Sequence, residues 1–294
     1  MTELALGTVQ LGMPYGVTNN AGQVTAQEAQ TILDAFAEDG GRWLDTAPAY
    51  GSSEALLRRT AASFAIVDKT IHLDATDAVT EGMQKLHRGL LASLQTLGRA
   101  SVDTLLCHQA WLVKSPWRQS VLDWLAQLKS GGYVKQAGVS IYQPGELDEE
   151  LLNHLDWVQF PLNVLDQRML DSGWLERLHR AGVTTQARSL YMQGVLLSPD
   201  GASIDIPSAI RARISAFHNT AVQRSIMPEA LALAFGRWSG VDQLVVGVNS
   251  LAEYRQLRKA WHQAEQLNAS TIDWGDYLVQ DSHWLNPSTW SRKV

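Results

Sequence analysis

Short apolar runs alternate with longer amphipathic segments along the whole chain, and this alternation predicts its architecture. The apolar runs have the length of β-strands and occupy residues 5–10, 42–45, 65–69, 102–108, 134–140, 157–160, 183–188 and 243–248. The amphipathic segments have the length of helices and lie near residues 25–39, 52–62, 77–97, 116–130, 144–154, 168–181, 220–238 and 250–265. This order is typical of an α/β fold with a parallel sheet. Because eight strands alternate with eight helices, the pattern favours a closed (β/α)8 TIM barrel over an open sheet.

Length and linker composition predict one domain. At 294 residues the chain exceeds the usual size of a domain, but α/β barrels of about 250 residues or more commonly form one. No proline- and glycine-rich linker divides the sequence, so we expect a single barrel over residues 1–294, with a C-terminal tail over about 266–294. The tail contains Trp274, Trp284 and Trp290, whereas disordered tails are poor in aromatic residues. We expect the tail to pack on the barrel, either over its mouth or against its outer helices.

Composition limits the partners and the compartment. Charged residues make up 18% of the chain and the net charge is −6, which argues against a nucleic-acid partner or a polybasic membrane contact. The single cysteine excludes an internal disulfide and suits a reducing compartment. The first residues lack the basic region and apolar core of a signal peptide, and no run approaches the roughly 20 apolar residues of a membrane span. We expect a cytoplasmic protein with no membrane partner.

Ionisable side chains stand at the ends of several predicted strands, where α/β enzymes build their sites. Asp45 ends one apolar run in the segment LDTAPAYGSSE, and Tyr50 lies on the loop that follows. Lys69 ends the run AIVDK, and His108 ends the run VDTLLCH. We expect these four side chains to meet in one pocket, with the Lys69 amine close to both Asp45 and Tyr50.

The four residue types suit proton transfer to a substrate oxygen. A free tyrosine has a pKa near 10, but a neighbouring lysine ammonium stabilises the phenolate and lowers that pKa. A buried lysine needs a counter-charge, which Asp45 supplies, and His108 can orient the same substrate oxygen. We expect Tyr50 to act as general acid for a carbonyl or general base for an alcohol. Such a site moves a proton only, so a nicotinamide cofactor must carry the hydride.

Nucleophilic and metal sites have less support in the sequence. Cys107 precedes His108, but adjacent strand residues point to opposite faces, so we expect Cys107 to pack in the core rather than to form a catalytic pair with that histidine. The remaining histidines are scattered, and no cluster of histidine, cysteine and carboxylate residues suggests a metal.

With these motifs the chain resembles the aldo-keto reductase superfamily. The similarity extends from LGTVQLG at 6–12 to VVGVNS at 245–250 and includes LDTAPAYGSSE with the later lysine and histidine. The resemblance implies a (β/α)8 barrel that binds NADPH or NADH without a Rossmann domain. It also implies a catalytic tetrad, and by matching motifs the tetrad consists of Asp45, Tyr50, Lys69 and His108.

The resemblance further implies where the cofactor binds. The nicotinamide carboxamide would be held by Ser140 and Gln159, and the pyrophosphate would run along Ser189, Leu190 and Gly194. The adenosine phosphate end would lie at the start of the last helix, beside Gly247 and Asn249. Many relatives grip the 2′-phosphate of NADP with a Lys-Ser pair and an arginine, whereas this chain has Val248 and Asn249 in place of the pair. Arg255 or Arg258 would have to substitute, so NADP is the family default and NAD the alternative.

We therefore expect an NAD(P)-dependent oxidoreductase that interconverts an aldehyde or ketone and the corresponding alcohol. Trp111, Tyr15 and Tyr191 are predicted to line the substrate pocket, and loops at 109–118 and 190–208 with the tail to set specificity. Two alternatives stay open. One is a sugar dehydrogenase that oxidises a lactol, and the other is a cofactor-sensing regulatory barrel with little turnover. The sequence defines neither the substrate within these classes nor the oligomeric state.

Overall fold

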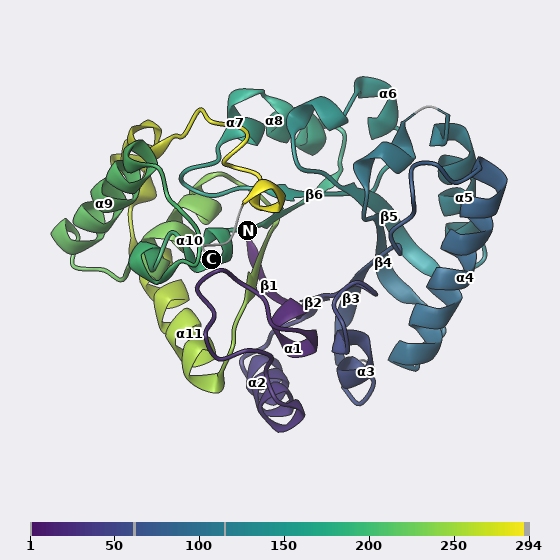
Figure 1. Ribbon diagram of the computed structural model, residues 1–294, viewed down its shortest axis with the longest axis horizontal. Helices are drawn as coiled ribbons and strands as arrows, with labels where there is room; N and C mark the ends of the chain where they lie inside the picture. The colour runs from purple at the N-terminus through teal and green to yellow at the C-terminus, as the bar shows by residue number, and fades with distance from the viewer. Residues whose placement is uncertain (1, 61–62, 115, 291–294) are drawn as a thin grey trace.

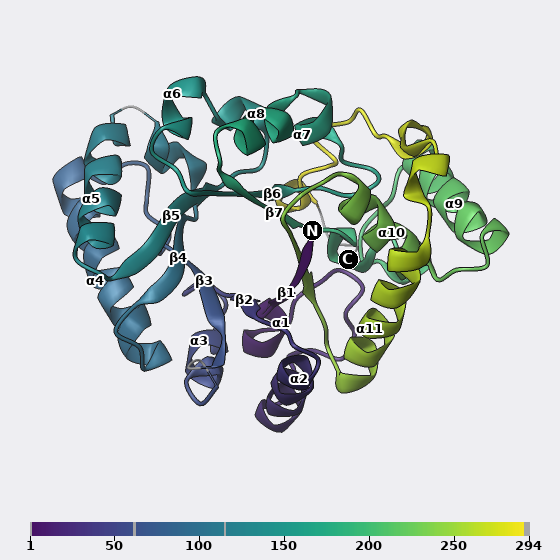
Figure 2. The ribbon, with the colours of Figure 1, turned by 180° about the vertical axis from the view of Figure 1, so that it is seen from behind.

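Eight parallel strands close into a barrel in the computed structural model, which describes residues 2–60, 63–114 and 116–290. Each strand pairs with its neighbour in sequence, and β1 pairs with β8 to close the ring. The helices surround this ring (Figures 1 and 2), so the predicted (β/α)8 barrel is confirmed. The strands are β1 (Glu3–Gly7), β2 (Trp43–Asp45), β3 (Ala65–Lys69), β4 (Val102–Cys107), β5 (Val134–Ser140), β6 (Trp157–Pro161), β7 (Thr184–Arg188) and β8 (Gln243–Gly247).

Most of the helices lie where the amphipathic segments predict them. The close matches are α2 (Ala26–Glu38), α4 (Val79–Leu97), α5 (Arg118–Ser130) and α11 (Leu251–Gln266). The predicted helix over 168–181 is divided into α7 (Arg168–Asp171) and α8 (Trp174–Arg180), because Gly173 between them has a left-handed φ of 71°. The segment 144–154 forms a 3₁₀ turn (Pro144–Glu146) and the short helix α6 (Glu149–Leu152).

Three segments differ from the prediction. The first strand ends at Gly7, and Val9–Gly12 forms a helical turn, α1, instead of continuing the strand. Helix α3 (Ser53–Leu57) is shorter than the predicted 52–62, of which residues 61–62 lie outside the described residues. Helix α9 (Ser208–Gln223) was not predicted, and α10 (Pro228–Trp238) accounts for most of the predicted helix over 220–238. Proline at the first position of α10 fixes where that helix begins.

The interior of the barrel is filled in layers, as the two-residue period of strands requires. A small interior cluster, packed around Val67, Leu106 and Trp157, lies within the barrel. Side chains two residues further along each strand point to the same interior and form the next layer toward the carboxyl ends. That layer contains Lys69, His108 and Gln159, so the apolar cluster forms the floor of the site.

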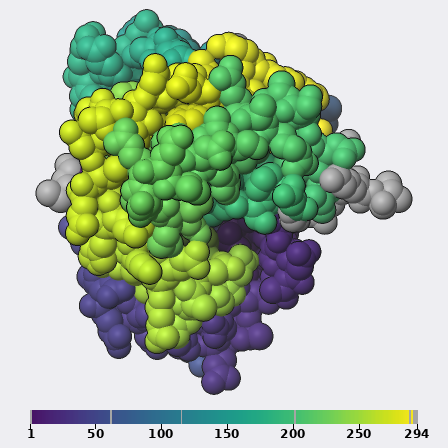
Figure 3. Space-filling model, turned by 90° about the vertical axis from the view of Figure 1, so that its left-hand side faces the viewer, coloured from purple at the N-terminus to yellow at the C-terminus, as the bar shows by residue number. Residues whose placement is uncertain are grey.

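The first part of the C-terminal tail packs on the outer helices, and Figure 1 shows its yellow end lying over the barrel near β6, so the tail occupies part of both predicted positions. Trp274 contacts the ring of Phe235 at 5.2 Å between centroids, and Tyr277 donates to the Thr220 hydroxyl at 2.7 Å. Figure 3 shows the yellow tail lying against the green surface of the 190–223 region. The tail also reaches the connection after β6, where Val279 N donates to Leu165 O at 3.0 Å. Among the described helices, none is long and apolar enough to cross a membrane.

Candidate active site

A buried ion pair between two neighbouring strands lies at the centre of the site. Asp45 ends β2 and Lys69 ends β3, and the Lys69 Nζ lies 2.7 Å from both carboxylate oxygens of Asp45. The same ammonium donates to the Thr46 carbonyl oxygen at 3.1 Å. Side-chain exposure is 1% for Lys69 and 6% for Asp45. Hydrogen bonds therefore satisfy both charges, as a buried pair requires.

Tyr50 lies beside this pair because two loops are in close contact. Its ring centroid is 5.1 Å from the Lys69 Nζ and 6.1 Å from the His108 ring, which it meets edge-on. The Tyr50 loop rests on Gly12, where a Cβ would lie 1.7 Å from the Tyr50 carbonyl oxygen. Only glycine fits at such an approach, which explains the glycine at the end of LGTVQLG. The structure thus brings the four residues predicted as catalytic to one place.

The protonation of Tyr50 differs from the sequence-based expectation. Burial, and then the charge of Asp45, raise the pKa of the Tyr50 hydroxyl well above its ordinary value, whereas we expected Lys69 to lower it. The physical reason is that burial disfavours the charged phenolate, and that Asp45, which binds the Lys69 ammonium with both oxygens, adds a negative charge beside the hydroxyl. Tyr50 is therefore a protonated phenol near neutral pH, so it is suited to donate a proton rather than to accept one.

His108 is a neutral imidazole in this environment. Burial lowers its pKa to about 2, and the positive charge of Lys69 acts in the same direction. Its backbone N–H donates to the Thr70 hydroxyl at 3.0 Å, while its buried Nδ1 has no hydrogen-bond partner within the described residues. The neighbouring thiol is not a nucleophile, because burial raises the pKa of Cys107 to about 12. A neutral His108 can orient a substrate oxygen but not protonate it.

A chain of buried amide side chains connects the ion pair to the far side of the barrel. Gln159 Nε2 donates to Asp45 Oδ2 and to Gln186 Oε1, both at 2.6 Å. Ser140 Oγ donates to Gln159 Oε1 at 3.1 Å, and Gln186 Nε2 donates to Gln243 Oε1 at 2.8 Å. Ser140 and Gln159 were predicted to hold the nicotinamide, and here they also orient the Asp45 carboxylate. The sequence analysis missed Gln186 and Gln243, which are polar residues at inward positions of apolar strands.

The segment predicted to run along the pyrophosphate has an unusual backbone. Ser189, Met192 and Gln193 all have positive φ, a conformation that side chains other than glycine rarely adopt. Gly194 has a φ of 93°, and a Cβ there would lie 1.9 Å from the Thr18 hydroxyl. Residues 14–25 therefore lie directly on this segment. Backbone strain of this kind clusters at ligand sites and is held by the surrounding structure.

Two carboxylates occupy the start of α11, where we expected the adenosine phosphate end of the cofactor. Glu253 Oε2 accepts from Asn249 N at 2.7 Å and from Asn249 Nδ2 at 3.0 Å. Glu28 Oε1, from α2, accepts from Leu251 N at 2.6 Å. These N–H groups are therefore already bound to anions. Beside them, a Cβ at Gly247 would meet the Gln10 amide at 2.2 Å, and Gln10 Oε1 and Asn249 Oδ1 are buried without partners in the described structure.

The two arginines predicted for the 2′-phosphate have different surroundings. Arg258 Nε lies 3.2 Å from Asp39 Oδ2, and the same oxygen accepts from the Tyr254 hydroxyl at 2.7 Å. Arg258 therefore joins α11 to the end of α2. Arg255 is exposed on α11. Neighbouring positions on one helix cannot reveal a partner such as Asp39, which lies far away in the sequence.

The three residues predicted to line the substrate pocket have different surroundings. Tyr15 belongs to the site, because burial and the nearby Tyr50 raise its pKa to about 12, and Arg188 opposes that shift. Trp111 is partly buried and packs edge-on against the Trp117 ring at 5.3 Å. The charge that acts on the Tyr191 hydroxyl comes from Glu229 of α10. In the described region, no hydrogen bond or ring contact joins Trp111 or Tyr191 to the catalytic four.

Arg188 is a site residue that the predictions did not include. It ends β7, two residues after the inward-pointing Gln186, so its side chain faces the barrel mouth. Its Nη2 donates to the Ile141 carbonyl oxygen at 3.0 Å, and its guanidinium lies 4.4 Å from the Tyr142 ring centroid. The sequence feature that could have identified Arg188 as a site residue is its position at the end of a strand.

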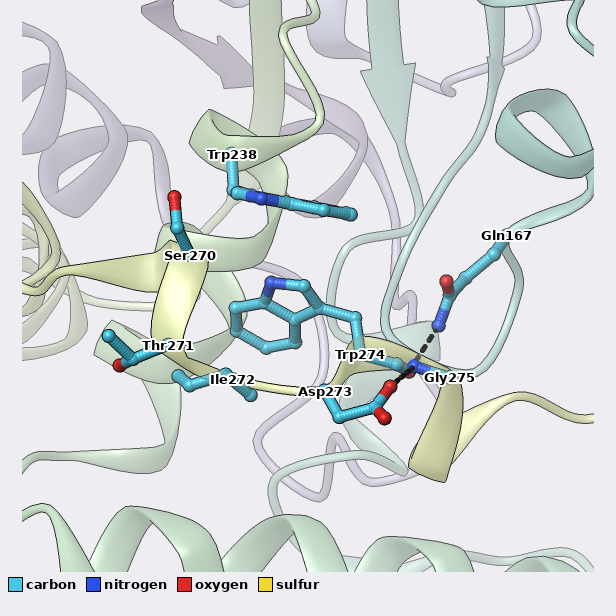
Figure 4. Close-up of a pocket in the computed structure, with 8 residues that line it drawn as sticks. All are labelled: Gln167, Trp238, Ser270, Thr271, Ile272, Asp273, Trp274 and Gly275. Atoms are coloured by element: carbon cyan, nitrogen blue, oxygen red, sulfur yellow. Dashed lines mark hydrogen bonds between the residues drawn. The ribbon is translucent and has the colours of Figure 1, made fainter.

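A separate hollow lies on the outer side of the barrel and is shown in Figure 4. It is bounded by Gln167, Trp238 and residues 270–275 of the tail, and Gln167 Nε2 donates to the Trp274 carbonyl oxygen at 2.7 Å. None of the catalytic four lines it. Within the described part of the chain, no group of histidine, cysteine and carboxylate residues could hold a metal ion.

Comparisons with known proteins agree on one family. A family model described as the aldo/keto reductase family matches residues 3–274. An aldo-keto reductase from Mycolicibacterium vanbaalenii is 29% identical over 222 residues, which cover 71% of this chain and 77% of that protein. The solved structure of an aldo-keto reductase from Bacillus halodurans, in its holo form, aligns with a TM-score of 0.68 and 16% identity over 91% of this chain and 92% of that one.

Proposed function

The chain belongs to the aldo/keto reductase family, and we propose that it is an NAD(P)H-dependent oxidoreductase that reduces an aldehyde or ketone to the alcohol. The observation that carries the proposal is the convergence of Asp45, Tyr50, Lys69 and His108 at the carboxyl ends of adjacent strands. A small carbonyl compound is the proposed partner. We also propose a cytoplasmic location, which the buried free thiol of Cys107 supports.

The nicotinamide, when bound, supplies the hydride that the side chains cannot. Tyr50 then donates a proton to the carbonyl oxygen, since its hydroxyl is protonated near neutral pH. His108, neutral because its pKa is lowered, orients the carbonyl oxygen by a hydrogen bond. The Lys69 ammonium, 5.1 Å from the Tyr50 ring centroid, favours the negative charge that develops on the Tyr50 oxygen, and Asp45 holds that ammonium in place. A lactol dehydrogenase would use Tyr50 as a base in the opposite direction, and the substrate panel below distinguishes the two.

The surroundings of the predicted cofactor path fit a nicotinamide dinucleotide better without a 2′-phosphate. The unpartnered amide oxygens of Gln10 and Asn249 and the close approach at Gly247 provide polar atoms and a side-chain-free surface. Glu28 and Glu253 place two negative charges at the start of α11. These would repel the 2′-phosphate of NADP, so the proposal includes tighter binding of NADH than of NADPH, against the family default.

A substrate panel tests the proposed function. Aldehydes, ketones and sugars are offered with NADH and NADPH, and turnover is followed by the nicotinamide absorbance. Tyr50→Phe is expected to lower kcat by about 10²–10⁴-fold while cofactor affinity and the unfolding midpoint stay unchanged. Unchanged turnover in Tyr50→Phe would overturn the assignment. Cofactor binding without turnover of any compound would favour the regulatory alternative, and turnover of sugars alone would favour the lactol dehydrogenase.

A further inference from the structure

The guanidinium of Arg188 lies at the mouth of the site in a fixed position. Its Nη2 donates to the Ile141 carbonyl oxygen, its Nη1 contacts the Ser189 hydroxyl at 3.4 Å, and its plane lies near the Tyr142 ring. These contacts come from the ends of β5 and β7, so two strands of the barrel hold the group. A guanidinium has five N–H donors, and these contacts leave several of them for a ligand.

Within the described residues, no carboxylate forms an ion pair with this cation. Among residues 2–60, 63–114 and 116–290, its partners are a carbonyl oxygen, a hydroxyl and an aromatic ring, and none is a carboxylate. Arg177 also lies near an aromatic ring, 4.9 Å from the Trp174 ring centroid, but unlike Arg188 it forms an ion pair, with Glu149 at 3.2 Å. A partly buried cation that the protein does not neutralise is suited to an anion from outside.

The charge of Arg188 acts on the residues that handle the carbonyl oxygen. It lowers the pKa of the Tyr50 hydroxyl and that of His108, and it acts likewise on Tyr15. Arg188 is therefore close to the proton-transfer end of the site. The carboxylate of Asp45 cannot serve as its partner, because Lys69 holds both of its oxygens.

We propose that Arg188 binds a carboxylate on the carbonyl substrate, so that the enzyme prefers aldehydes or ketones that carry this anionic group. The inference rests on the proposed function and specifies its substrate class. An anion could also come from the cofactor as its pyrophosphate. The substrate is favoured because Ile141, which holds the guanidinium, directly follows Ser140 at the nicotinamide end of the expected cofactor path, where the carbonyl compound must also bind. The charge of Arg188 on Tyr50 and His108 agrees with this placement.

The test compares charged and uncharged aldehydes of similar shape. 4-Carboxybenzaldehyde is paired with its methyl ester, and kcat/KM is measured for both in the unmutated protein and in Arg188→Gln, Arg188→Lys and Arg177→Gln. We expect the unmutated protein to prefer the acid. Arg188→Gln should reduce the acid-to-ester ratio by about 10- to 100-fold, mainly through KM, because charge-assisted hydrogen bonds have that strength. Arg188→Lys should restore part of the ratio, and Arg177→Gln should leave it unchanged.

Other results would separate the explanations. An equal preference for acid and ester in the unmutated protein would overturn the inference and leave the proposed function intact. Weaker NADH binding in Arg188→Gln with an unchanged ratio would assign the arginine to the cofactor and also overturn it. If neither aldehyde is turned over, the proposed function fails for this class. Calorimetric binding of benzoate to the protein with NADH then decides, because the inference requires binding that Arg188→Gln abolishes.

Discussion

Asp68 is the residue whose environment is least favourable to its charge. It precedes Lys69 on β3 and points to the opposite face, away from the barrel interior. It is fully buried, and neither carboxylate oxygen has a hydrogen-bond partner in the described chain. Burial, and then the charge of Glu54 on α3, raise its pKa well above the usual range, and the nearby backbone N–H of Lys69 opposes this only partly. Burial raises the pKa of Glu54 too, so two acids face each other behind the catalytic strand.

The raised pKa of Asp68 gives a prediction about stability and pH. A carboxyl whose pKa is higher in the folded state adds stability that is full below its unfolded pKa and is lost as pH rises through the folded pKa. Asp68→Asn keeps the shape and removes the titration, so it should raise the free energy of unfolding more at pH 8 than at pH 4. Each unit by which the folded pKa exceeds the unfolded pKa, up to pH 8, adds about 1.4 kcal/mol to this difference. Urea unfolding at the two pH values measures the difference.

Asp123→Asn is the matched control, because Asp123 is exposed on α5 and should show almost no effect at either pH. A stabilisation by Asp68→Asn that is equal at both pH values, or a loss, would show that Asp68 stays ionised in the folded protein.

At the scale of single residues, the positions of the catalytic side chains were predictable but their ionisation was not. Asp45 and Lys69 end apolar runs, and a parallel sheet brings the carboxyl ends of its strands together regardless of the exact helix boundaries. The pKa of Tyr50 depends instead on how deeply the hydroxyl is buried and then on the nearby charge of Asp45, and no sequence pattern encodes either. Arg188 was missed as a site residue for a similar reason. Only the structure shows that, within the described residues, no carboxylate forms an ion pair with its guanidinium.

At the scale of elements, strands were predicted better than helices. Buried parallel strands are continuous apolar runs, so β3 and β5 match their predicted ranges residue for residue. Helix α9 was missed because its buried face packs on the tail and α10, which are distant in sequence, and its exposed face includes Val222 at 76% exposure. Helix α1 replaces the end of a predicted strand because the Tyr50 loop rests on Gly12. Contacts distant in sequence therefore account for both errors.

The start of α11 gives a prediction about cofactor choice. Glu253→Gln keeps an acceptor for the Asn249 N–H but removes one of the two charges near the expected 2′-phosphate. Repulsion between exposed charges about 4 Å apart is worth about 1 kcal/mol, so NADPH affinity should rise about fivefold relative to NADH affinity. Fluorescence titration of both cofactors measures the ratio, and high salt should reduce the effect.

Glu38→Gln, an exposed carboxylate at the end of α2, serves as the control and should not change the ratio. If Glu253→Gln changes the affinities for NADH and NADPH equally, the Glu253 carboxylate does not act on the 2′-phosphate. If the unmutated protein binds NADPH more tightly than NADH, it follows the preference for NADP that is usual in the family.

At the scale of the whole molecule, the tail joins the outer helices to the mouth. Trp274 is buried to 3% exposure, packs on Phe235, and accepts a hydrogen bond from Gln167 through its carbonyl oxygen. Gln167 lies in the connection after β6, and Asn163 in the same connection donates to the Ser189 carbonyl oxygen at 3.1 Å. A continuous set of contacts thus runs from the tail to the strained segment beside the site, so the tail can support the site.

This arrangement predicts a large and position-specific cost for truncating one tryptophan. Trp274→Ala removes a buried ring and should lower the free energy of unfolding by about 3–5 kcal/mol in guanidinium denaturation. Trp238 borders the same hollow and stacks on Trp274, but it is 44% exposed, so Trp238→Ala should cost much less. If the two substitutions cost the same, the tail is a surface attachment rather than part of the core. If Trp274→Ala also weakens cofactor binding while Trp238→Ala does not, the connection through Gln167 and Asn163 transmits the loss to Ser189.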